Sequence, residues 1–208
     1  MDLLPLETAP IEGRAQSISV FRPNVTREEA IALLSPSLLQ RWGWLHGSRP
    51  LRSVAELYIP FQLFRAKIFR RAAADEKLVA IDLFSGLLDP FEFPSPPAPH
   101  LFIDTQSRNR PGPALSCQQG GEVLRSKVQR LIFQVGFFRA GNLKIEVEPV
   151  TTFHMPYWIG FYGARESAAI EVLDAVRRVK EGAKFRRLVS DWIVGQDELA
   201  QTISDRSA

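Results

Sequence analysis

The chain has 208 residues, of which 45% are hydrophobic and 24% are charged, and its formal net charge is +3. This composition excludes a largely disordered chain, and a positive charge this mild does not by itself identify nucleic acid as the partner. The single cysteine, Cys117, excludes an intramolecular disulfide and a cysteine-based zinc site.

The first predicted elements are a strand over residues 18–21 and a helix that begins after Thr26. Thr26 and Glu29 have the spacing of a capping box, in which each side chain binds the backbone N–H of the other residue. Pro36 should end or interrupt this helix, because proline lacks the N–H that a helix interior needs.

Two similar octapeptides, at residues 57–64 and 153–160, are the strongest sign of internal repetition. Both read apolar, ring, apolar, proline, aromatic, and each is followed by a second apolar run that contains an aspartate. The pattern predicts two β-hairpins. Proline cannot donate a ladder hydrogen bond, so we expect Pro60 and Pro156 on a sheet edge or at a strand start.

Residues 89–119 are rich in proline and are predicted to form an extended connector followed by a polar loop. Within this segment, residues 101–103 can form a strand that corresponds to residues 18–21. Gly120 and Gly121 should precede a second helix, and this junction is either an anion site or a plain loop-to-helix turn. A half-buried strand is expected over residues 143–147. Apolar residues at helical spacing then predict an amphipathic C-terminal helix. They are Phe185, Leu188, Val189, Trp192 and Ile193.

The sequence therefore predicts an α+β protein that uses a strand–helix–hairpin unit twice, with antiparallel sheets, packed helices and a C-terminal amphipathic helix. The expected segments are a first repeat at residues 1–88 and a connector with its loop at 89–119. A second repeat follows at 120–182, and a C-terminal helix and tail at 183–208.

The first repeat resembles a known group of proteins. Residues 26–30 (Thr-x-x-Glu-Ala), residues 58–61 (Tyr-Ile-Pro-Phe) and a strand carrying Asp82 are similar to the region after the zinc ribbon in uncharacterised bacterial zinc-ribbon proteins, sometimes labelled helicase-like. The resemblance covers about residues 18–90, and the second repeat is a fainter echo. The chain departs from that group in lacking the ribbon cysteines and any Gly-x-x-x-x-Gly-Lys-Ser/Thr loop. The resemblance implies a related fold in a bacterial protein and no activity.

The sequence has no concentrated set of catalytic or metal-binding residues. It lacks a Gly-x-Ser-x-Gly motif, and its histidines have no second ligand nearby, so we predict no metal and no cofactor. Asp82 and Asp174 hold equivalent places in the two repeats and could form an acidic pair for acid–base catalysis. The favoured alternative is that each carboxylate binds the backbone amides of a turn at the end of its strand.

Two surfaces are candidates for binding. The outer face of the repeated hairpins could offer a mixed aromatic and polar surface to a ligand or partner, or could be buried under helices. Its residues are Tyr58, Gln62, His154 and Trp158. The basic segment 177–187 could bind nucleic acid or another anion, although a solvated helix face is favoured. Its cations are Arg177, Arg178, Lys180, Lys184, Arg186 and Arg187.

These features favour a non-catalytic protein-interaction or scaffold module that binds a protein partner or associates with itself. The contact could be made by the hairpin face, by the proline-rich connector or by the amphipathic C-terminal helix with Trp192. The first alternative is a small enzyme or ligand-binding protein with a site between the repeats, and the second is a nucleic-acid-binding protein. No stretch approaches the roughly 20 apolar residues that cross a bilayer, and the N-terminus lacks the basic residues of a secretory signal. We therefore expect a cytoplasmic protein with no membrane insertion.

Overall fold

The structure is a computed structural model that describes residues 16–36, 49–70, 73–87, 93–134, 144–163 and 169–206. Within these ranges the chain forms one mixed sheet of six strands, three α-helices and a short 3-10 helix, η2. The α+β class is as predicted, but the strands share a single sheet that is mixed, because β1 and β5 are parallel, where antiparallel sheets were expected. The elements are β1 (Gln16–Phe21), α1 (Arg27–Leu34), β2 (Leu51–Arg70), β3 (Ala73–Asp82), η2 (Pro99–Leu101), β4 (Phe102–Ser107), α3 (Cys117–Gln134), β5 (Lys144–Tyr162), β6 (Ala169–Asp174) and α4 (Ala183–Arg206).

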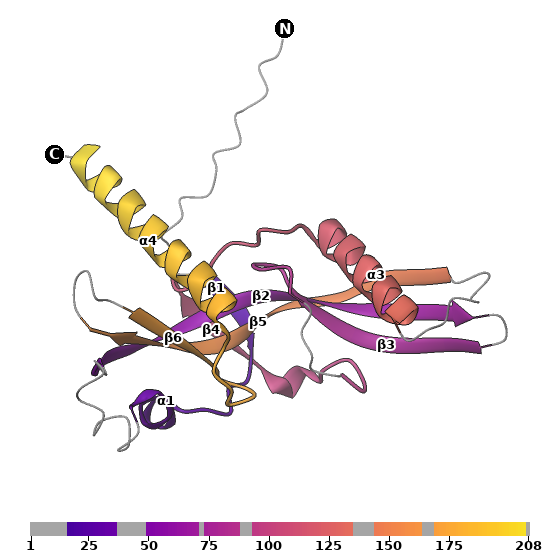
Figure 1. The fold of residues 1–208 in the computed structure, drawn as a ribbon, viewed down its shortest axis with the longest axis horizontal. Helices are drawn as coiled ribbons and strands as arrows, with labels where there is room; N and C mark the ends of the chain where they lie inside the picture. The colour runs from indigo at the N-terminus through magenta and orange to yellow at the C-terminus, as the bar shows by residue number, and fades with distance from the viewer. Residues whose placement is uncertain are drawn as a thin grey trace, which may run out of the picture.

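Two long strands, β2 and β5, form the spine of the sheet (Figure 1). They pair antiparallel along nearly their whole length, with Ile59 opposite Met155 near the middle. β3 pairs with the outer edge of β2, and β6 pairs with the outer edge of β5. β1 and β4 pair with each other, and β1 joins β5 through a parallel contact of Val20 with His154. The spine therefore positions every other strand.

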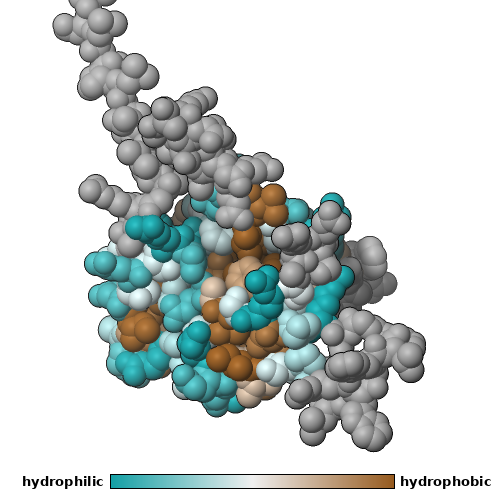
Figure 2. All heavy atoms as spheres, turned by 90° about the vertical axis from the view of Figure 1, so that its left-hand side faces the viewer, coloured by the Kyte–Doolittle hydropathy of each residue, from teal (hydrophilic) through white to brown (hydrophobic). Residues whose placement is uncertain are grey.

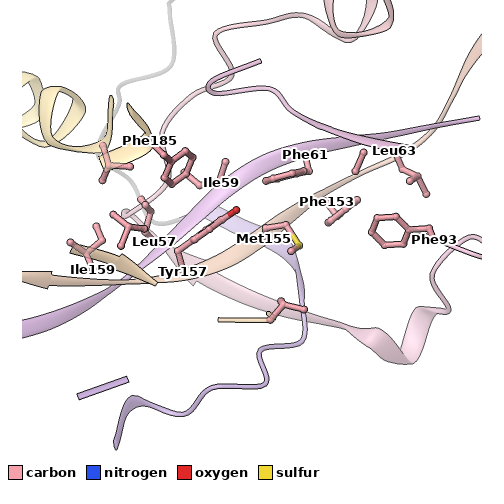
Figure 3. Close-up of a cluster of buried hydrophobic side chains, with 14 of the residues drawn as sticks. Leu57, Ile59, Phe61, Leu63, Phe93, Phe153, Met155, Tyr157, Ile159 and Phe185 are labelled. Atoms are coloured by element: carbon pink, nitrogen blue, oxygen red, sulfur yellow. The ribbon is translucent and has the colours of Figure 1, made fainter. Parts of the chain in front are cut away.

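The main core lies on one face of the spine. Alternate residues over 57–63 and 153–159 point to this face, because successive side chains of a strand alternate. All eight are apolar and buried, as predicted, and Figure 3 draws them together with Phe185 of α4 and with Phe93. A fully buried side chain of this size contributes about 1.5–3 kcal/mol. The eight residues are Leu57, Ile59, Phe61, Leu63, Phe153, Met155, Tyr157 and Ile159.

Pro60 and Pro156 lie in the middle of the two central strands, which corrects the expectation of a sheet edge or strand start. β3 ends at Asp82 and β6 ends at Asp174, beside the residues that follow the prolines. In an antiparallel pair, the N–H and C=O of one residue point to the same neighbouring strand. Each proline carbonyl accepts an N–H from the turn after the outer strand. Each proline therefore lacks an N–H only on the side where the outer strand, β3 or β6, has already ended, so no strand-to-strand hydrogen bond is lost.

α1 begins at the predicted capping box. The hydroxyl of Thr26 accepts the N–H of Glu29 at 3.3 Å, and the Glu29 carboxylate accepts the N–H of Thr26 at 2.9 Å. The helix ends at Leu34, two residues before Pro36, as predicted. No helix of the described ranges is long and apolar enough to span a membrane.

α3 begins at Cys117, earlier than the sequence predicted, so Gly120 and Gly121 lie inside it. Ser116 and Gln119 form a second capping box: the Ser116 hydroxyl accepts the Gln119 N–H at 3.2 Å, and the Gln119 amide oxygen accepts the Ser116 N–H at 2.8 Å. The N–H of Gly120 already donates to the Ser116 carbonyl at 2.9 Å. The hypothesis of an anion site at the glycine pair therefore loses its basis.

Gly120 allows α3 to approach the sheet closely. A Cβ on Gly120 would lie 3.2 Å from Leu83 and 3.4 Å from Phe64, whereas one on Gly121 would lie at an ordinary 3.5 Å from Phe64. Alanine normally stabilises a helical glycine position by about 0.5–1 kcal/mol. We expect Gly121→Ala to raise the free energy of unfolding by about that amount, and Gly120→Ala to raise it less or to lower it. Urea denaturation measures both free energies of unfolding. An equal increase in the two variants would show that α3 does not approach the sheet closely at Gly120.

Two segments differ from the predicted boundaries. Residues 102–107 form β4, which overlaps the strand expected at residues 101–103 but extends further into the expected polar loop. Residues 144–147, expected as a separate strand, are the start of β5. The sequence pointed to a break after residues 144–147 because Pro149 follows them. The pairing of β2 with β5 shifts register at this point: Leu63 lies opposite Thr151 and Phe64 lies opposite Pro149, so Val150 is skipped and β5 continues through the proline.

Candidate functional site

Asp82, the first candidate carboxylate, closes the turn that follows β3. Its Oδ1 accepts the N–H of Phe84 at 2.7 Å and of Ser85 at 3.1 Å, and its Oδ2 accepts the Ser85 hydroxyl. Lys127 of α3 donates to the Gly86 carbonyl of the same turn at 2.6 Å. Burial holds the pKa of Lys127 below its ordinary value, while the charge of Asp82 acts in the opposite direction. The lysine therefore ties α3 to this turn.

Asp174, the second candidate carboxylate, is fully buried in the turn after β6. Its Oδ1 accepts the N–H of Val176 and of Arg177, both at 2.7 Å. Its Oδ2 accepts the Nε of Arg177 at 2.7 Å and the Nη2 at 2.6 Å. Two nitrogens of one guanidinium therefore contact the same carboxylate oxygen and balance its buried charge, while the other oxygen binds the two backbone N–H groups.

The two aspartates do not meet. β3 and β6 lie on opposite sides of the spine, and the pairs Phe61–Asp82 and Tyr157–Asp174 are staggered along it. Three strand spacings across the sheet and four residues along it separate the two carboxylates by roughly 20 Å. This distance is too large for a shared acid–base site, and each group instead binds the amides of its own turn.

Tyr58 and Gln62, on the outer face of the first hairpin, are buried. The Gln62 amide donates to the carbonyls of Leu63 and Thr151, both at 3.0 Å, and accepts the Thr152 hydroxyl at 2.7 Å. The Tyr58 hydroxyl donates to the Glu56 carboxylate at 2.8 Å. Burial and the nearby carboxylate raise the pKa of Tyr58. These side chains serve packing within the chain rather than an open surface.

Trp158, on the outer face of the second hairpin, is also buried, under α1. Its indole N–H donates to the Val25 carbonyl at 3.0 Å, just before the helix begins. Four residues further along β5, the Tyr162 hydroxyl donates to the Leu34 carbonyl at the end of α1, at 2.5 Å. Burial and then Glu171 raise the pKa of Tyr162 to about 12. β5 thus holds α1 at both of its ends.

His154 is half-buried where β1 meets β5. Burial and the nearby charge of Arg110 lower its pKa below the ordinary 6.5, although a hydrogen bond to the Ser19 backbone opposes the shift. The unfolded chain therefore binds this proton more readily than the folded one, and stability falls as the pH drops below about 6.5. We expect His154→Gln to flatten this fall between pH 7 and pH 5, as measured by urea unfolding. The exposed His100→Gln serves as the control and should leave the fall in place.

The basic segment is divided between two elements and is mostly neutralised. Arg177, Arg178 and Lys180 follow β6, and the other three cations lie in α4. Lys180 and Lys184 are exposed. The other four form ion pairs, which are Arg177 with Asp174, Arg178 with Glu29, Arg186 with Glu171 and Arg187 with Asp191. The segment therefore does not present the continuous cationic face that phosphate binding favours.

The C-terminal helix α4, which the sequence offers as one of three elements that could contact a partner, lies beside an apolar part of the sheet. Seen from the end of the molecule that carries β6, apolar side chains gather in a central band between hydrophilic flanks (Figure 2). Phe161 and Ile170 of the sheet, and Trp192 and Ile193 of α4, pack only partly against the core, and Val194 is 54% exposed. The helical spacing of the C-terminal segment was the available signal, but the sheet residues beside it could not be found from it.

An open groove of about 430 Å³ lies beside the proline-rich stretch. Pro96, Pro97 and Phe102 form apolar walls, and Asp104 supplies one carboxylate. Among the described residues no three His, Cys, Asp or Glu side chains lie close enough together to hold a metal. The groove therefore has little of the convergent polar chemistry that ligand sites use.

No protein-family model, no curated protein and no solved structure matches this chain. The resemblance to zinc-ribbon proteins stays a prediction. The functional interpretation therefore rests on the geometry of the sheet and of α4.

Proposed function

We propose that this chain is a non-catalytic protein-interaction module, in which the sheet holds α4 as the element that binds a protein partner. The observation that supports this proposal is the position of the helix. α4 has 24 residues, so it is about 36 Å long, and in Figure 1 its C-terminal half extends beyond the sheet.

The two halves of α4 differ in what they contact. Phe185 and Val189 are buried in the core, and the Phe185 ring lies 5.4 Å from that of Tyr157. Trp192 and Ile193 are only partly covered. In sequence, Leu199 and Ile203 continue the same apolar stripe at helical spacing. An amphipathic helix that extends past its own core in this way is suited to bind a further protein surface.

We also infer that the platform beneath α4 arose by duplication of a β-α-β-β unit. The element order β1-α1-β2-β3 recurs as β4-α3-β5-β6. Ile59 and Met155 hold the same place in the two octapeptides and pair with each other in the spine. A two-fold axis through that pair would map one strand onto the other.

The turns and helix starts support the same relation. Asp82 and Asp174 each donate a backbone N–H to the carbonyl five residues later, at 3.0 and 2.9 Å. A residue with positive φ follows at the same offset in both turns, Gly86 at 70° and Arg178 at 62°. Both α1 and α3 begin with a capping box. A duplicated frame with no duplicated active site favours a structural or binding role.

The test is a truncation that removes residues 196–208 and keeps the core contacts of α4. Full-length and truncated chains are compared by native affinity capture from the source cells, with quantitative mass spectrometry. We expect the full-length chain to retain a protein in near-stoichiometric amount, either another chain or further copies of itself, and the truncated chain to lose it. Loss of binding should be at least tenfold.

The control is the fold of the truncated chain. Because Phe185 and Val189 remain, its circular dichroism should change only by the missing helix turns, and its cooperative unfolding should persist. If neither version retains a stoichiometric protein, or if both retain the same one, α4 is not the binding element and the proposed function is wrong.

A further inference from the structure

The charges of α4 have the opposite arrangement to the one that stabilises an isolated helix. Cations belong near a helix C-terminus and anions near its N-terminus, because of the partial charges at the two ends. In α4 the first two turns contain cations and no acid, and the last turns contain more acids than cations. The early cations are Lys184, Arg186, which pairs with Glu171 of β6, and Arg187, which pairs weakly with Asp191. The later charges are Asp197, Glu198, Asp205 and one cation, Arg206. The helix would thus benefit from an external charge at each end.

Gly195 is a second unexplained feature of α4. Glycine in a helix interior is less favourable than alanine, so it needs a reason. A Cβ at Gly195 would have no atom within 4 Å, so packing inside this chain does not require the glycine. A glycine on a helix surface allows another backbone to approach closely, because it carries no Cβ.

Gly195 also belongs to a stripe along the helix. Leu188, Trp192, Gly195 and Leu199 follow one another at intervals of four, three and four residues. These intervals are those of helices that pack side by side with a small crossing angle. Leu188 and Trp192 are only half-buried by the chain's own sheet. The stripe is therefore available, in part, to a second helix.

We propose that α4 pairs antiparallel with α4 of a second copy of this chain, crossing near Gly195. The proposal rests on the proposed function and names the partner. Antiparallel pairing places the cationic first half of each helix beside the acidic second half of the other. It also sets opposite helix ends side by side, which offsets their partial charges. Parallel pairing would instead bring like charges together, which opposes association.

The test uses sedimentation velocity of the purified full-length chain over a range of concentrations and at two salt concentrations. We expect a dimer that weakens at high salt. The double reversal Lys184→Glu with Arg187→Glu should raise the dimer dissociation constant at least tenfold. Glu198→Lys with Asp205→Lys should do the same, because positions 198 and 205 flank the stripe and a crossing at Gly195 sets position 205 beside the first turn of the partner helix. Combining all four changes should restore most of the affinity, because the first half of each helix, now acidic, again lies beside a second half of opposite charge in the partner. Each reversal places acids near the N-terminus of α4 or cations near its C-terminus, which a helix favours. Circular dichroism should therefore show no loss of helix.

The matched control reverses charges on the exposed face of another helix. Glu122→Lys with Arg125→Glu in α3 exchanges one acid and one cation three residues apart, and both side chains are exposed. This variant should keep the dissociation constant within about twofold of the unchanged chain, because long-range charge effects at the surface are largely screened.

Gly195 gives an independent test with effects of opposite sign. Gly195→Ala should raise the helix content and melting temperature of the dilute monomer but weaken the dimer, and Gly195→Leu should abolish the dimer. If Gly195→Ala stabilises the monomer and leaves the dissociation constant unchanged, no helix crosses at this position.

Three results would overturn the antiparallel pairing. One is a chain that stays monomeric at every concentration while the cellular capture recovers a different protein, an outcome that leaves the proposed function intact. Another is a dimer that both charge reversals leave unchanged. The last is failure of the combined four-residue variant to regain affinity while its helix remains folded. A chain that is monomeric and also recovers no helix-dependent partner overturns the proposed function as well.

Discussion

Phe153→Ala is expected to lower the free energy of unfolding by about 3–5 kcal/mol, the range for truncation of a buried phenylalanine. Phe153 is 2% exposed and is surrounded by aromatic rings from separate parts of the chain. The substitution therefore leaves a cavity where β1, β2, β4 and the residue Phe93 meet (Figure 3). The rings and their centroid distances are Phe21 at 6.2 Å, Phe61 at 6.0 Å, Phe93 at 6.3 Å and Phe102 at 5.7 Å.

Urea denaturation followed by tryptophan fluorescence measures this loss. Phe133 of α3 offers a matched control, because it is 41% exposed and outside the core clusters. Phe133→Ala should change the free energy of unfolding by no more than about 0.5 kcal/mol. Equal effects of the two substitutions would mean that the aromatic cluster does not join these strands.

Asp174→Ala is expected to destabilise the fold by about 3–5 kcal/mol, because it removes one member of a buried ion pair. The substitution leaves the N–H groups of Val176 and Arg177 without their acceptor and leaves the Arg177 guanidinium without its counter-charge. Asp174→Asn keeps one acceptor oxygen for the two amides and loses only the charge. We expect its cost to be about half that of the alanine variant.

The exposed pair between Arg187 and Asp191, whose atoms lie 3.9 Å apart, supplies the control. Asp191→Ala should cost no more than about 0.5 kcal/mol, because an exposed ion pair of this kind contributes little. Thermal and urea unfolding of the three variants give the comparison. An alanine variant at position 174 as stable as the one at 191 would show that the buried aspartate does not hold its turn.

Local chemistry made several elements predictable. The capping box at Thr26 and Glu29 fixed where α1 begins, since its two reciprocal hydrogen bonds involve residues only three apart. The aspartates marked the ends of β3 and β6, because a carboxylate there binds the next amides of the chain. The spacing of apolar residues likewise predicted α4. Each of these features depends on residues within a few positions of one another.

The sequence-based predictions were wrong where contacts with residues far away in the chain outweighed a local preference. Pro60 and Pro156 were expected at an edge because proline lacks an N–H, but the end of the outer strand beside each one removes that conflict. Gly120 was expected before a helix, although its role is to let α3 approach Leu83 and Phe64. Neither neighbour is adjacent in sequence, so no local pattern could reveal it.

For the candidate site, too, local features were predictable and their surroundings were not. The sequence singled out Asp82, Asp174 and the outer hairpin face, but only the strand order separates the two carboxylates and buries Tyr58, Gln62 and Trp158. The pattern of charges and the glycine in α4 could be read from the sequence. Their meaning depends on how much of the helix the sheet leaves uncovered.

Local patterns were sufficient to predict the α+β class, the helix start at Thr26, the two turn aspartates and the amphipathic C-terminal helix, because hydrogen bonds and side-chain periodicity act over a few residues. Contacts between distant segments place both halves in one mixed sheet, set the prolines in its centre and leave α4 extending beyond its own core. These outcomes depend on pairing between residues far apart in the chain, where burial and strand ends override local preference.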